Sequence, residues 1–253
     1  MEKTNFKYND YKQLSRLESE LLNSIGELML CSVAKVKRMT GWKTSSIKNV
    51  LHSLTKKGVL VHLGNNLYVD SGKIAENIFS IATLARPPSY ISFWTACSYY
   101  GFTEQQVKTI QLVSPHQYPP LEIGTYPIET IAVLPKRFFG YQKILNFAIA
   151  EKERLLVDLL YKPELCGGIG EVKKCLKAMW PEIRQKIVIE YLITFGNKSC
   201  FARLGYLLEE LQIKNTIKQI LLKHLPACFV KLNPARKNAP NYNKRWRINI
   251  NDQ

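Results

Sequence analysis

Hydrophobic residues recur at helical spacing in the N-terminal part of the chain, and this pattern predicts a series of short amphipathic helices. The first spans residues 14–25, where apolar side chains repeat every three or four positions. The second follows Ser32, a suitable N-cap, and directs Val33 and Val36 inward. It should end at Gly41, because glycine suits the left-handed conformation that terminates many helices.

A third amphipathic helix is predicted from Thr44 to Lys57, with Gly58 ending it. Its apolar stripe follows the i, i+3, i+4, i+7 spacing of one buried helix face and consists of Ile47, Val50, Leu51 and Leu54. The polar side chains that lie away from this stripe are Ser45, Lys48, Asn49, His52 and Lys56. This helix should therefore bury one side and present a polar, basic side to solvent.

Two short runs follow, residues 59–63 and 67–69, and both have the composition of β-strands. The Gly64-Asn65-Asn66 segment between them is typical of a hairpin turn. Helix, helix, turn, helix and hairpin is the order of a winged helix-turn-helix. We therefore predict that residues 1–72 form a winged helix-turn-helix DNA-binding domain.

The pattern changes after Gly72, so residues 73–253 are predicted to form a second, larger domain of mixed α/β structure. The whole chain then belongs to the α+β class. The segments expected here are a linking helix at 74–85, a helix capped by Ser89 and ended by Gly101, a compact sheet within 108–149, mostly helices from Glu151, and closing strands in CFVKL and RWRINI.

Charge is concentrated in two acid-free segments, and together they account for the whole formal net charge of +16. The first, residues 28–69, holds seven lysines and arginines and coincides with the predicted DNA-binding domain. The second, residues 211–251, holds nine more. Clustered positive charge without local acids is what a polyphosphate partner requires.

Composition excludes several classes of protein. The apolar runs are shorter than the roughly 18 to 20 residues that a membrane span needs, so we expect no membrane association. No apolar stretch follows the polar start, so we expect no secretory signal and a cytoplasmic location. The six cysteines and four histidines are scattered, which predicts reduced thiols and neither a metal site nor a cofactor.

The exposed side of the Thr44 to Lys57 helix is the candidate DNA-reading surface, because the second helix of such a motif enters the major groove. Asn49 is suited to a bidentate contact with adenine, and Lys48 to a contact with guanine or phosphate. The wing would lie along the backbone or in a minor groove. The predicted DNA-binding residues are Lys43, Thr44, Ser45, Lys48, Asn49, His52, Lys56, Lys57, His62, Asn65 and Asn66. The alternative is a basic helix that is merely solvated, or a winged helix that binds protein.

Four later segments stand out together: PSYISFWTACSYYGFTEQ (88–105), IAEKERLLVDLLYKP (149–163), ARLGYLLEEL (202–211) and the ending KRWRININ. They resemble the AbiEi family of antitoxins and transcriptional regulators from type IV toxin–antitoxin and phage-defence systems. They occur in the family's order, after a winged-helix start that ends in a wing and a tyrosine, here Asn66-Leu67-Tyr68. The resemblance covers most of the chain and lies in the order of several moderate matches.

The resemblance implies a repressor whose N-terminal domain binds inverted repeats of double-stranded DNA in its own promoter. It also implies that the C-terminal domain opposes a nucleotidyltransferase-like toxin, without necessarily forming a stable complex with it. Binding as a symmetric pair would place half-sites about 10 bp or a multiple apart. The oligomeric state itself is left open by the sequence.

Other interpretations are weighed beside this one. A nucleic-acid-processing enzyme would need a catalytic motif, and we find no phosphate-binding glycine loop, HExxH or nucleophile set, so no enzyme is predicted. Glu151, Glu153 and Asp158 are interpreted as helix acids rather than paired catalytic carboxylates. Arg203 can contact a partner or take part in packing, and the basic ending can touch nucleic acid or be solvated. A DNA-binding regulator or replication-associated protein without a toxin is the remaining alternative.

Overall fold

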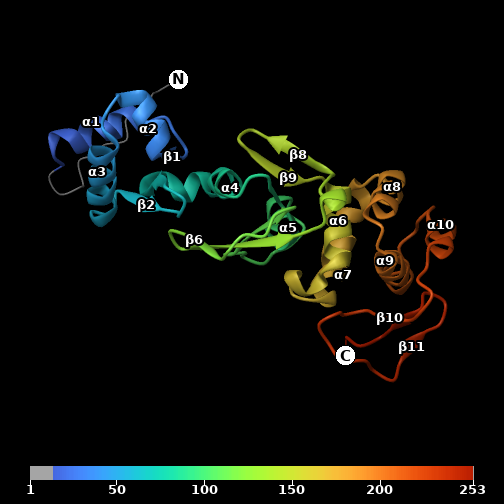
Figure 1. Cartoon of the computed structure of the whole chain (residues 1–253). Coiled ribbons are helices and arrows are strands. Elements are labelled where there is room, and N and C mark those ends of the chain that lie inside the picture. The colour runs from blue at the N-terminus through green and yellow to red at the C-terminus, as the bar shows by residue number, and fades with distance from the viewer. Residues whose placement is uncertain (1–13, 253) are drawn as a thin grey trace. The chain divides into compact units, whose positions relative to one another are not determined.

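A computed structural model describes residues 14–252, and the chain divides into two compact units. The N-terminal unit comprises Met1–Pro87 with Pro120–Ile128, and the C-terminal unit comprises Pro88–Pro119 with Glu129–Gln253. The boundary expected after Gly72 therefore falls inside the N-terminal unit, which continues through the next helix to Pro87. Helices and several short sheets make this an α+β protein (Figure 1).

The N-terminal unit begins with three helices and a small sheet. Its elements are α1 (Arg16–Ile25), β1 (Cys31–Ser32), α2 (Val33–Thr40), α3 (Thr44–Lys56), β2 (Leu60–His62), β3 (Leu67–Asp70) and α4 (Ile74–Ala85). The strands form an antiparallel sheet in the order β1-β3-β2. The predicted helices and hairpin are confirmed, with their bounds shifted by no more than a residue or two.

Local signals explain where these helices begin and end. Ser15 and Glu18 form a reciprocal capping box at the start of α1. The Ser32 side chain caps α2 by accepting from the backbone N–H of Lys35, as the sequence predicts. Gly41 ends α2 in the left-handed region at φ 72°, where a side chain would be strained.

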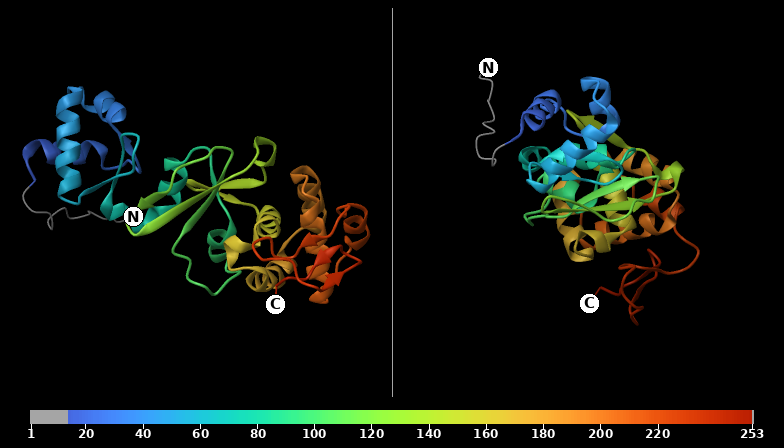
Figure 2. Two further views of the ribbon diagram at one scale, coloured as in Figure 1. Left: turned by 60° about the horizontal axis from the view of Figure 1, so that its bottom comes forward. Right: turned by 60° about the vertical axis from the view of Figure 1, so that its left-hand side comes forward.

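The C-terminal unit is built on a sheet followed by helices, which gather at one side of that unit's strands (Figures 1 and 2). The six strands are β4 (Tyr90–Ile91), β5 (Ile110–Ser114), β6 (Leu121–Ile123), β7 (Tyr126–Ala132), β8 (Tyr141–Ile144) and β9 (Phe147–Ala150), in the order β6-β7-β5-β4-β9-β8. Strand β6 and the start of β7 belong to the N-terminal unit by their contacts.

The helices of the C-terminal unit follow the predicted order. They are α5 (Phe93–Tyr99), α6 (Lys152–Tyr161), α7 (Ile169–Met179), α8 (Gln185–Phe195), α9 (Lys198–Glu210) and α10 (Lys218–Lys223). A second small sheet closes the chain, formed by β10 (Val230–Lys231), β11 (Tyr242–Asn243) and β12 (Ile248–Asn249) in the order β10-β12-β11.

One local prediction is wrong. The helix expected from Ser89 starts later, because Tyr90 and Ile91 pair as strand β4 and Ser92 takes the N-cap position. At Tyr90 and Ile91, tertiary pairing of β-branched and aromatic residues overrides the local helical pattern. Within the predicted sheet, the run KILNFAIA contributes to the hairpin β8–β9, which turns at Leu145 with φ 52°.

Candidate nucleic-acid interface

Helix α3 divides into a buried face and an exposed face along its whole length. Ile47, Leu51 and Leu54 are fully buried, and Val50 is nearly so. They pack with Leu21, Leu22 and Ile25 of α1 and Val36 of α2 in the core of the N-terminal unit, and Trp42 lies against that core. The orientation of α3 is therefore fixed by packing, which leaves its opposite side for solvent or a partner.

All eleven residues predicted to bind DNA are exposed in the structure. Ser45, Lys48, His52 and Lys56 follow one another at three- and four-residue intervals, so they form a row along the open face of α3. Asn49 lies beside this row, and Lys43 and Thr44 lie at the start of the helix. The structure thus brings the seven helix-associated residues onto one element and one side.

Lys57 differs from its neighbour Lys56 because it is held in an ion pair. Its Nζ lies 2.7 Å from Oε2 of Glu18, a residue of α1 that is only 3% exposed. Ser53 donates a hydrogen bond of 2.7 Å to the other carboxylate oxygen of Glu18. Burial by itself raises the pKa of Glu18, but the hydrogen bonds from Lys57, Ser15 and Ser53 outweigh it and lower the pKa to about 2. The Lys57 charge is therefore used to fasten α3 to α1.

The backbone conformation of the turn between β2 and β3 explains its sequence. Gly64, Asn65 and Asn66 all have positive φ, at 84°, 48° and 58°. Asparagine tolerates this left-handed region better than most residues, so the two asparagines suit the turn independently of any DNA contact. His62 packs its ring against Tyr68 across the strand pair, with centroids 4.6 Å apart.

Further cations of the first acid-free segment were not among the predicted site residues. Lys37 and Arg38 are exposed in the last turn of α2, where positive charge also complements the helix dipole. Lys35 is half-buried in the same helix. The signal that identifies them in the sequence is the absence of acids across the whole segment, rather than the pattern of α3 alone.

The carboxylates of α6 form structural contacts in the C-terminal unit. Asp158 is fully buried and pairs with the fully buried Arg154 at 2.7 Å, while Ser92 donates a hydrogen bond of 2.7 Å to it. Burial raises the pKa of Asp158, and the Arg154 guanidinium acts in the opposite direction. Glu153, 4% exposed, accepts from the backbone and side chain of Arg184. A buried, paired Asp158 has no surface to offer a substrate.

Arg203 is also buried, and the packing interpretation fits it. Its Nε donates to the backbone oxygens of Lys231 and Leu232, and its Nη1 donates to that of Leu160, at 2.8 to 3.1 Å. These bonds fasten α9 to α6 and to the closing sheet. Gly205 of α9 permits the close approach of the Trp246 indole.

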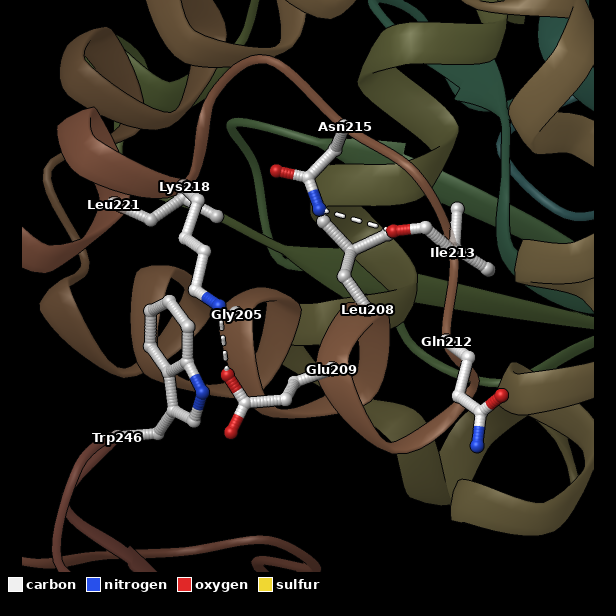
Figure 3. A pocket seen from close by; sticks show the side chains of 9 residues that line it. All are labelled: Gly205, Leu208, Glu209, Gln212, Ile213, Asn215, Lys218, Leu221 and Trp246. Atoms are coloured by element: carbon white, nitrogen blue, oxygen red, sulfur yellow. Dashed lines mark hydrogen bonds and ion pairs between the residues drawn. The ribbon is translucent and has the colours of Figure 1, made fainter.

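A cavity of about 200 Å³ lies beside that indole (Figure 3). Lys218 and Glu209 form an ion pair of 3.2 Å at its wall, and the Asn215 amide donates to the Ile213 carbonyl. Trp246 Nε1 and Asn215 Oδ1 also line it, but protein atoms cover both, and neither has a partner among the described residues.

Within residues 14–252, histidine, cysteine, aspartate and glutamate do not gather in groups of three that could hold a metal ion. The cysteines are free thiols, and all but Cys228 are buried. No helix in this part of the chain is long and apolar enough to cross a membrane.

Among solved structures, the chain is similar to the crystal structure of the Rv2827c protein from Mycobacterium tuberculosis. The alignment has a TM-score of 0.67, covers 94% of this chain and 92% of that one, and has 14% sequence identity. The two proteins therefore share a fold over nearly their full lengths. No protein-family model and no curated protein matches the sequence.

Proposed function

We propose that this protein is a DNA-binding transcriptional repressor whose N-terminal unit is a winged helix-turn-helix with α3 as the recognition helix. The order α1, β1, α2, α3, β2, β3 and the three-stranded sheet β1-β3-β2 support the assignment. The observation that carries it is the open face of α3, polar and basic along its length and free of acids, opposite a fully buried stripe. A helix of this kind fits the major groove of B-DNA.

In this proposal the residues of α3 divide the work between bases and backbone. Asn49 is suited to reading adenine and Lys48 to guanine or a nearby phosphate, since both project from the middle of the open face. Lys43 and Lys56, at the two ends, are suited to phosphates and would set the register without reading sequence. The β2–β3 turn, with Asn65 and Asn66, acts as the wing.

We further propose that the repressor is the antitoxin of a type IV toxin–antitoxin system and binds inverted repeats in its own promoter. This part rests on the AbiEi resemblance of the sequence. The second candidate is a regulator of the same kind without a toxin, and the acid-free face of α3 favours both equally. Expressing the neighbouring gene alone and then with this one separates them: restored growth supports the antitoxin, and unrelieved toxicity, or no toxicity, contradicts it.

The adjacent lysines at the end of α3 provide the sharpest test of the DNA interface. We expect Lys56→Ala to weaken binding and to lower the salt slope of the affinity by about 1, the effect of losing one phosphate contact. Lys57→Ala should change that slope little, because Glu18 already neutralises Lys57. Fluorescence anisotropy with the upstream DNA, measured across a salt series, distinguishes the two variants.

Sequence reading is tested with Lys48→Ala and Asn49→Ala on the upstream duplex and on a scrambled duplex. Loss of the preference between the two duplexes is the expected result. Asn23→Ala, an exposed asparagine on α1, is the matched control and should bind as the wild type does. Equal affinity of the wild type for both duplexes would mean that the interface contacts phosphates without reading the sequence, and it would refute the repressor proposal.

A further inference from the structure

The second acid-free segment, residues 211–251, folds instead of trailing into solvent. Its end forms the sheet β10-β12-β11, where β10 runs parallel to β12 and β11 runs antiparallel to it. Trp246, 1% exposed, lies over Gly205 of α9 and anchors this sheet to the helices. Arg247 donates hydrogen bonds to the backbone oxygens of Pro226 and Ala227 and so fixes the loop that leads into β10.

Two large aromatic side chains of this sheet are exposed. Phe229 and Tyr242 each expose 48% of their surface, although they contact one another edge to face with centroids 5.0 Å apart. The pair therefore presents ring surface that the protein itself does not cover. Two adjacent exposed rings form a small apolar patch, which is a candidate contact surface for a partner.

Basic residues lie on the same strands and connecting loops as the aromatic pair. Lys231 stands in register with Asn249, and Asn249 with Tyr242, so the three side chains project to the same side of the sheet. Other cations of the same strands and loops are Arg236, Lys237, Lys244 and Arg247, all exposed. Arg245 and Lys218 of the same acid-free segment both form ion pairs with Glu209.

We propose that this closing sheet binds single-stranded nucleic acid, with Phe229 and Tyr242 stacking on unpaired bases and Lys231, Lys237 and Lys244 contacting the phosphates. Aromatic rings and cations side by side are the combination that single strands require, because their bases are open to stacking. A duplex keeps its bases paired and would leave the rings without a partner. The site lies outside α3 and is independent of the repressor function.

The test uses fluorescein-labelled U12, dT12 and a mixed-sequence 12-bp duplex with the full-length protein. The background variant Lys43→Ala/Lys48→Ala/Asn49→Ala/Lys56→Ala removes the base and phosphate contacts proposed for α3. We expect both single strands to bind more tightly than the duplex, with tighter U12 than dT12 binding if the 2′-hydroxyl is also read. Phe229→Leu/Tyr242→Leu, which keeps apolar volume but removes the rings, should weaken U12 binding about ten-fold per ring.

Matched controls separate stacking from general effects. Tyr141→Leu removes an aromatic side chain that is also partly exposed, at 41%, and should leave U12 affinity unchanged. Lys244→Ala should lower the salt slope by about 0.7, whereas Lys186→Ala, an exposed lysine on α8, should not. Circular dichroism and melting temperature establish that each variant is folded.

Three results would overturn the proposal. One is unchanged U12 affinity in the folded Phe229→Leu/Tyr242→Leu protein. Another is a preference for the duplex over both single strands in the α3-substituted background, which would indicate that the cations contact phosphates and the rings do not stack on bases. The third is binding to phosphatidylserine vesicles without binding to either oligonucleotide, which would assign the aromatic pair to a lipid surface.

Discussion

Replacing Glu18 by glutamine tests whether the ion pair between α1 and α3 holds the candidate DNA-binding helix in place. Glutamine keeps the shape of the side chain but has one acceptor oxygen in place of two, so it can accept from Ser15 or from Ser53, and the substitution removes the charge together with one hydrogen bond. The shift of the Glu18 pKa from 4.5 to about 2 corresponds to roughly 3.4 kcal/mol at about 1.36 kcal/mol per pKa unit. The Lys57 side chain is 32% exposed, so solvent screening should reduce the measured loss to about 1–2 kcal/mol.

The same pair predicts how stability depends on pH. Because the pKa of Glu18 is depressed in the folded state, its contribution is fully present above about pH 4.5. That contribution is lost as the pH falls through about 2, where the folded-state carboxylate is protonated. Wild-type stability should therefore converge on that of Glu18→Gln between these values.

The measurement must report the N-terminal unit by itself, because the chain has two units. Urea unfolding at pH 7, 4.5 and 2, followed by a deuterium pulse and mass spectrometry of the peptide containing α3, meets this need. Glu20→Gln, an exposed acid on the same helix, is the control. If Glu18→Gln and Glu20→Gln unfold at the same urea concentration at pH 7, the ion pair does not stabilise α3 and the reasoning fails.

Two further predictions concern buried contacts of the C-terminal unit, each measured by urea unfolding. Arg154→Met leaves Asp158 buried without its partner and should cost about 3–5 kcal/mol, whereas adding Asp158→Leu should recover most of that loss. Gly205→Ala would place a methyl group 2.1 Å from the Trp246 ring and should cost about 1–3 kcal/mol or more. Gly170→Ala, in α7 with open space around it, should instead stabilise by up to about 1 kcal/mol.

The N-terminal elements could be predicted because their signals are local. Helix α2 begins at Ser32, whose side chain caps it, and ends at Gly41, whose backbone adopts the left-handed conformation. Both signals belong to the residue itself and do not depend on contacts with distant segments. The buried stripe of α3 follows from one helical period. The exposure of the candidate DNA-binding residues follows from the same period, since a residue opposite the stripe has nowhere else to lie.

Contacts between distant segments explain what could not be predicted. Glu18 and Lys57 are far apart in the sequence, so nothing local marks Lys57 as paired while Lys56 beside it has an open position. Arg154 and Asp158 stand at i and i+4 on one helix, yet the residues that complete their burial, such as Tyr90 and Ser92, come from segments far upstream. The local sequence places Tyr90 in a helix, because nothing near it marks its pairing with Val113 of the distant strand β5.

The formal charge of residues 28–69 is therefore larger than the charge that is available to contact DNA phosphates. Of the seven cations between residues 28 and 69, Lys57 is paired with Glu18 and Lys35 is half-buried. The other five are exposed, and if all of them contacted phosphates the salt slope would be about −4.5 per protomer at 0.9 for each contact. A shallower slope means that only part of the face is used. A slope steeper than about −5 on the upstream duplex would mean that cations outside this segment also contact DNA, and the 211–251 segment is the remaining concentration of charge able to supply them.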